Sequence, residues 1–188
     1  MALSSRFVGA VSSAARSAGA ALDSLGASME VTRYVERLVP STRFVPHNGV
    51  APRAPLSFVS PSSTLVGDVT LAAGSSVWYG AVVRGDVNPV SVGANSSIGE
   101  NAVVHVAKIQ GDLPTSIGEN VTIGPGAIVH AATLGSNVLL GARAQVLDGA
   151  TVEDNVVVEA GAVVSPGSTL RSMTVYAGVP AKEVRKLK

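Results

Sequence analysis

An aliphatic side chain recurs at about every sixth residue through most of this chain. Neither an α-helix nor a single strand gives this period over about 100 residues, because their repeats are 3.6 and 2 residues. A parallel β-helix with three short strands per coil does give it, since each aliphatic side chain then points into one narrow core. The period therefore predicts an all-β solenoid. Its expected core positions are Leu65, Leu71, Val77, Val83, Val92, Ile98, Val104, Ile117, Ile123, Ile128, Leu134, Leu140, Val146, Val152, Val158, Val164 and Leu170.

Residues 117–128 show how one unit of the repeat is built. Ile117 is followed by Gly118 and then by the turn-tolerant Asn120 before the next aliphatic residue. Glycine and asparagine suit corners that need a positive φ or a close approach of two backbones. The 20 glycines and the aromatic content of only 4% thus fit a thin aliphatic core.

Composition excludes several classes of function. The 14 Lys and Arg nearly balance the 13 Asp and Glu, and no basic stripe interleaved with aromatics follows the repeat, which argues against nucleic-acid binding. The absence of cysteine removes disulfides, thiol nucleophiles and cysteine-ligated zinc. No uncharged apolar run is long enough to span a bilayer, so any membrane contact is peripheral.

Residues 1–30 differ from the rest, being rich in Ala and Ser with no acidic residue before Asp23. On a helical wheel they form an amphipathic helix. We expect a retained helix that lies in a membrane interface or against a membrane protein. A cleaved mitochondrial presequence and a helix packed on its own β-helix are the alternatives. The apolar contact residues are expected to be Leu3, Phe7, Val11, Leu22 and Leu25.

The remaining chain divides into a linker over 31–55, a β-helix over 56–176 and a C-terminal cap over 177–188. Four prolines argue against a helix in the linker. Residues 107–115 interrupt the repeat as an excursion from one corner. We expect residues 181–188 to form a short helix of about two turns that covers the open end of the solenoid.

Two histidines, His105 and His130, lie within the repeat, whereas His47 falls in the linker and is expected to face solvent. A neutral imidazole is a good zinc ligand. A histidine on a β-helix is more often a corner residue bonded to backbone, so its position in the repeat does not by itself indicate a metal.

Five segments resemble the γ-class carbonic anhydrases, and in particular the γ-carbonic-anhydrase-like subunits of mitochondrial respiratory complex I in plants and algae. The WYGAVVRGDVN string is the specific one, whereas the hexapeptide repeat is shared with many acyltransferases. The resemblance covers nearly the whole chain. The segments are Val77–Asn88, Val103–Lys108, Leu113–Thr115 before Ile117, Val121–Gly124 and Tyr176–Lys182.

The resemblance implies a left-handed β-helix that forms trimers with zinc between neighbouring subunits. Each zinc takes two histidines from one subunit and one from the next. His105 and His130 match the two histidines that share a face, but Pro125 stands where the histidine that reaches across belongs. Proline has no side-chain donor for a metal, so zinc is expected only at an interface where a paralogue supplies the third imidazole.

Two further positions are carried over from the resemblance. Gly99 stands where the active pattern has a glutamine that orients metal-bound water. Arg84 and Asp86 match a pair that joins subunits, the alternative being an exposed ion pair with no partner. Both comparisons favour assembly over independent catalysis.

Three functions remain open from the sequence. The favoured one is a structural and assembly subunit of the complex I membrane arm. Its expected location is the matrix side of the mitochondrial inner membrane, and its expected partners are two paralogous subunits, with membrane-arm subunits or lipid at the N-terminal helix. The second is a carbonic anhydrase whose site is shared with a paralogue. The third is a hexapeptide acyltransferase with a histidine as general base.

Overall fold

The computed structural model describes residues 43–108 and 113–188, together with helical positions between residues 11 and 25. The chain divides into two compact units, Met1–Pro40 and Ser41–Lys188. In the first unit the helical positions are Val11, Ala14, Ala15, Ser17, Ala18, Gly19, Ala21, Leu22 and Leu25.

The N-terminal helix is thus confirmed where it is described. Val11, Leu22 and Leu25 are helical and expose 53%, 68% and 55% of their surface. Leu3 and Phe7 lie outside the described residues. Within the described residues no helix combines the length and the apolar character needed to cross a bilayer. The contact of this helix with a membrane stays a prediction.

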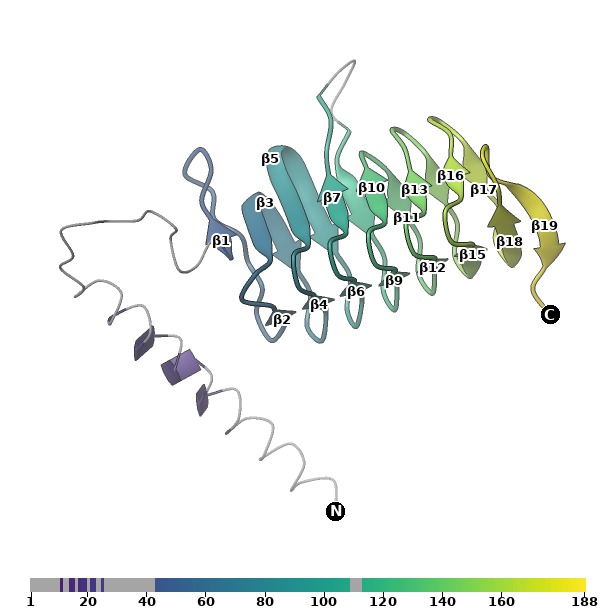
Figure 1. Ribbon diagram of the computed structural model, residues 1–188. Helices are drawn as coiled ribbons and strands as arrows, with labels where there is room; N and C mark the ends of the chain where they lie inside the picture. Colours follow the sequence, from purple (N-terminus) through teal and green to yellow (C-terminus); the bar gives the residue numbers. More distant parts are fainter. Residues whose placement is uncertain are drawn as a thin grey trace. The chain divides into compact units, whose positions relative to one another are not determined.

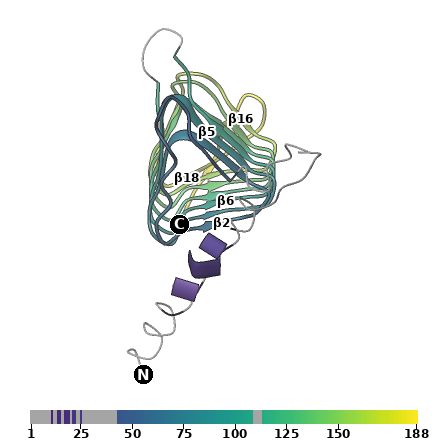
Figure 2. The ribbon, with the colours of Figure 1, turned by 90° about the vertical axis from the view of Figure 1, so that its left-hand side faces the viewer.

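The second unit is a parallel β-helix, as the six-residue period predicts, and its cross-section is a triangle (Figure 2). One side of the triangle is an eight-stranded sheet in the order β19-β18-β15-β12-β9-β6-β4-β2. Its strands are β2 (Phe58–Val59), β4 (Ser76–Val77), β6 (Ser97–Ile98), β9 (Thr122–Ile123), β12 (Leu139–Leu140), β15 (Val156–Val158), β18 (Thr174–Ala177) and β19 (Lys182–Lys186).

An eleven-stranded sheet forms the other two sides of the triangle. The long strands β3 and β5 turn the corner between these two sides, and the order is β16-β13-β10-β7-β5-β8-β11-β14-β17, with β3 against β5 and β1 against β3. The strands are β1 (Phe44–Val45), β3 (Thr64–Leu71), β5 (Val82–Val92), β7 (Val103–His105), β8 (Thr115–Ile117), β10 (Ile128–His130), β11 (Thr133–Leu134), β13 (Gln145–Val146), β14 (Thr151–Val152), β16 (Val163–Val164) and β17 (Thr169–Leu170).

The core is a column of buried aliphatic side chains along the axis of the solenoid. Successive coils stack in register along the axis (Figure 1), and in the regular part the partners Gln145 and Val163 lie 18 residues apart. Three hexapeptides therefore make one coil. The parallel ladders place equivalent side chains of neighbouring coils side by side, about 4.8 Å apart, and this stacking builds the site described below.

One expected core position is wrong by a residue. Val129 is fully buried, whereas Ile128 is half-buried on the outside of the coil. The side between Val129 and Leu134 holds five residues instead of six and turns at Ala131, whose φ is 48°. The five-residue spacing thus falls after Val129, between Val129 and Leu134, and not before Ile128 as the expected core positions imply.

The expected linker is partly structured. Within 31–55, β1 pairs with β3, and Arg53 bridges to Thr70. These segments cover the N-terminal edge of the eleven-stranded sheet. In the excursion expected at residues 107–115, Ala107 and Leu113 pair with one another and Thr115 already belongs to β8, while residues 109–112 lie outside the described residues.

The expected C-terminal helix is wrong. Residues Lys182–Lys186 form β19, which runs antiparallel to β18 and is the last strand of its sheet (Figure 1). The backbone groups of β18 that would otherwise face solvent need partners, and an added strand supplies them where a helix would not. The cap at residues 177–188 therefore exists, but as an edge strand.

Candidate functional site

His105 and His130 lie side by side at the ends of β7 and β10. The two strands pair in register, with His105 opposite His130. The Nδ1 of His105 is 3.2 Å from the Nε2 of His130, and the ring centroids are 5.1 Å apart. Both side chains are partly exposed, at 23% and 32%. The structure thus brings together the two histidines that the sequence analysis selected.

A carboxylate holds the outer nitrogen of each imidazole. The Nε2 of His105 lies 3.1 Å from Oδ1 of Asp86, and the Nδ1 of His130 lies 2.5 Å from Oδ1 of Asp148. Sequence reasoning missed the second contact. The stacking register accounts for it, because Val129 pairs with Val146 and Asp148 lies two residues further along the next coil.

Asp86 also binds the guanidinium of Arg84 through its Oδ2. Burial raises the pKa of Asp86, but the hydrogen bonds from Arg84 and His105 and the charge of Arg84 outweigh burial, so this pKa lies below its ordinary value. Asp86 is therefore a carboxylate near neutral pH. Arg84 and Asp86 pair within the chain, and their role at a subunit interface stays a prediction.

The carboxylates determine which nitrogen of each neutral imidazole carries the proton. A carboxylate only accepts hydrogen bonds, so the Nε2 of His105 and the Nδ1 of His130 donate. The Nδ1 of His105 and the Nε2 of His130 are then unprotonated, and their lone pairs face the same space. Metal-binding histidines typically have this arrangement, in which one ring nitrogen donates to a carboxylate and the other keeps its lone pair for the metal.

The two facing nitrogens fit one metal ion only in part. Tetrahedral zinc with Zn–N bonds of about 2.0–2.1 Å places two nitrogens about 3.3–3.4 Å apart, close to the 3.2 Å between His105 and His130. A catalytic zinc takes three protein ligands. Among the described residues no group of three or more His, Cys, Asp or Glu side chains is arranged to hold a metal ion. A single chain thus offers two of the three nitrogens.

Pro125 lies away from the histidine pair, at the corner that follows β9 of the eight-stranded sheet. Together with Trp78, Gly99 and Glu100 it lines a shallow groove of about 240 Å³. A Cβ on Gly99 would come within 2.7 Å of the carbonyl oxygen of Ile123, so this corner takes no larger side chain without a backbone shift. The groove offers no imidazole.

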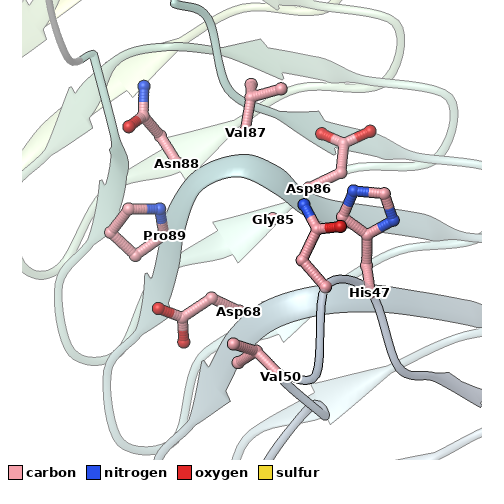
Figure 3. A pocket seen from close by; sticks show the side chains of 9 residues that line it. His47, Val50, Asp68, Gly85, Asp86, Val87, Asn88 and Pro89 are labelled. Carbon is pink, nitrogen blue, oxygen red and sulfur yellow. The ribbon is translucent and has the colours of Figure 1, made fainter.

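His47 is exposed, as expected, but it also lines a second open pocket, of about 180 Å³. Figure 3 shows its ring beside the carboxylate of Asp86, with Asp68 and Asn88 across the pocket. The pocket shares Asp86 with the histidine pair. Sequence analysis did not predict that His47 shares a pocket with Asp86, because β1 and its turn fall in the expected linker.

Comparison with known proteins identifies the family of this chain. It matches the hexapeptide repeat of succinyl-transferase over residues 89–131, 114–137 and 131–166. It is 42% identical to gamma carbonic anhydrase 1, mitochondrial, of Arabidopsis thaliana over 92% of this chain. It is also 34% identical to a carbonic anhydrase of Geobacillus kaustophilus, with 76% of this chain and 77% of that protein covered. The chain belongs to the γ-carbonic anhydrase family.

A solved structure has a similar fold. A hexapeptide transferase family protein from Anaplasma phagocytophilum matches with a TM-score of 0.74 and 36% identity over 78% of this chain and 86% of that one. The present chain itself spans 64% of the length of the Arabidopsis gamma carbonic anhydrase 1.

Proposed function

We propose that this chain is a γ-carbonic-anhydrase-like assembly subunit that has no complete zinc site of its own. One observation carries the proposal. His105 and His130 converge on a single metal position, while no third ligand lies near them among the described residues. Two imidazoles are too few to hold a zinc-bound water at the pKa that CO₂ hydration requires.

The site becomes complete if a neighbouring subunit supplies the third nitrogen. A paralogue with a histidine at the position of Pro125 would do so at the interface that His105 and His130 line. The interface that Pro125 approaches would lack one ligand. The proposed assembly is therefore a heterotrimer with two paralogous subunits and zinc at one shared interface. Shared CO₂ hydration at that interface is the alternative function.

The proposed location is the membrane arm of mitochondrial complex I, on the matrix side of the inner membrane. The mitochondrial names of its Arabidopsis relatives support the organelle. The exposed apolar residues of the N-terminal helix, Val11 and Leu22 among them, support a contact with a membrane protein or lipid at this end of the chain.

Metal analysis tests the proposal. We expect the chain purified alone to hold far less than one zinc per chain. Co-purification with a paralogue that has a histidine at the corner position should give about one zinc per mixed interface. His105→Ala in this chain should remove that zinc. Stoichiometric zinc in the chain purified alone would contradict the proposal. CO₂ hydration by the mixed assembly, lost with His105→Ala, would establish the shared enzyme instead.

An acyltransferase is the remaining candidate, and it has two observations in its favour. The match to a succinyl-transferase repeat is one, and the Asp148–His130 pair, which has the form of a general base held by a carboxylate, is the other. Titration with acetyl-CoA in a calorimeter separates this function from the proposal. We expect no binding of acetyl-CoA to the isolated chain.

A further inference from the structure

The positive charge of the chain is concentrated at its C-terminal end. Residues 171–188 contain five basic side chains and one acidic side chain, Glu183, a net charge of +4. Because the whole chain has a net charge of +1, the first 170 residues carry −3. Such an asymmetry typically indicates a contact with an anionic partner. The five basic residues are Arg171, Lys182, Arg185, Lys186 and Lys188.

Three of these cations have no acidic partner among the described residues. Glu183 pairs with Lys186 at 3.1 Å, and Arg171 pairs with Glu153 at 3.3 Å. Lys182, Arg185 and Lys188 form no ion pair in that part of the chain. Their charge is therefore available to a partner.

The same end of the solenoid exposes aliphatic side chains. All five residues of β19 are exposed, since this strand has a neighbour only in β18 (Figure 1). Val184 within the strand exposes 58% of its surface, and Val179 in the preceding turn exposes 72%. Two exposed valines among unpaired cations differ from the Thr side chains on the outside of β11, β14 and β17.

We propose that the C-terminal segment of residues 171–188, which includes the cap, is a contact surface for a membrane with anionic lipids. Lys and Arg side chains gain free energy near such a surface, and small exposed aliphatic side chains enter the headgroup layer. Each cation close to the surface raises partitioning about fivefold, so the three unpaired cations together account for about a hundredfold. The attraction is screened within about 8 Å at physiological ionic strength.

Nucleic acid fits this surface less well, because the cap presents no exposed aromatic side chain for base stacking within residues 171–188. An acidic protein is the other possible partner. The two exposed valines favour a bilayer, because they add an apolar contribution that a purely charged partner would not use.

Co-sedimentation of the full chain with vesicles tests the proposal. We expect binding to phosphatidylcholine vesicles that contain phosphatidylserine, weakening steeply with salt. Replacement of Lys182, Arg185 and Lys188 by Gln should reduce partitioning about ten- to a hundredfold. The matched control replaces Arg53, Lys108 and Arg143 by Gln. It removes the same charge elsewhere on the β-helix and should leave binding within about twofold of the unaltered chain.

The N-terminal helix needs its own control, because it is amphipathic as well. Val11→Glu with Leu22→Glu weakens its apolar contribution, and the C-terminal dependence should persist in that variant. Unchanged partitioning of the C-terminal Gln variant would overturn the proposal, as would equal binding to pure phosphatidylcholine. A third outcome would also overturn the proposal. If the chain binds soluble polyglutamate but no vesicles, and the C-terminal Gln variant loses that binding, the surface is assigned to an acidic protein. Circular dichroism confirms that each variant is folded.

Discussion

In the proposed function, zinc binding by this chain alone depends on the side chain at position 125, which is Pro125. It is exposed on a corner, so its replacement costs little stability. We expect Pro125→His to raise the zinc content of the chain purified alone towards one per chain, because the third imidazole then reaches the His105–His130 pair of a neighbouring copy. Mass spectrometry of the metal content checks this.

The control for that substitution is Pro125→Ala, which removes the ring without adding a ligand and should leave zinc low. A zinc content that does not differ between the His and Ala variants would argue against the arrangement of ligands across an interface. We expect the restored zinc to give little CO₂ hydration, because the resemblance implies a water-orienting glutamine at position 99, where this chain has Gly99.

The sequence was sufficient to select His105 and His130, but not to show what holds them. Their selection came from their place within the repeat and from the resemblance to the γ-class carbonic anhydrases. Asp148 was missed because it belongs to the next coil, and the contact of its carboxylate with an imidazole depends on the stacking register. The resemblance indicated Asp86 as an interface residue, whereas the structure also bonds it to His105.

At the scale of elements, one corner of the solenoid is stabilised by a ladder of asparagines. Asn120, Asn137 and Asn155 stack on successive coils with φ of 55°, 57° and 57°. Each side-chain amide donates to the next asparagine side chain, at 3.3 Å in both contacts. Asparagine tolerates the left-handed conformation better than other residues that have a Cβ.

Replacement of the middle member tests the ladder. Asn137→Ala loses both side-chain hydrogen bonds and retains a strained φ, so we expect a loss of about 1–2 kcal/mol in the free energy of unfolding. Asn137→Gly loses the same bonds without the strain and should be less destabilised. Thermal and urea unfolding measure both. Equal stability of the Ala variant and the unaltered chain would show that the ladder is incidental.

The six-residue period predicted the elements well because it reports burial directly. It failed at Ile128, where a side of five residues shifts the buried position to Val129. The separate prediction of a helix at residues 181–188 was wrong, because their mixed charged and aliphatic pattern suits a short helix as well as an edge strand. Pairing with β18 determines that this segment becomes a strand, because the open edge of β18 is a property of the folded solenoid and not of the local sequence.

For the whole molecule, the ends of the solenoid are the places where its stability and its association are controlled. Each coil contacts only its neighbours, so a terminal coil leaves one row of backbone groups unpaired unless something covers it. β1 covers part of the first coil, and β19 covers the last strand of the eight-stranded sheet. Residues 178 and 181 also bond to Val163, the edge of the other sheet.

Removal of residues 182–188 should therefore expose a strand edge rather than merely shorten the chain. We expect the truncated protein to unfold at a lower temperature and to form larger species as its concentration rises, because the open edge of β18 pairs with other copies. Light scattering coupled to size-exclusion chromatography measures this.

The Gln variant of Lys182, Arg185 and Lys188 retains the strand and should keep the size of the unaltered protein. A truncated chain whose mass is independent of concentration would show that β19 does not protect the edge. Association of the Gln variant would show instead that charge, and not the added strand, keeps the ends apart.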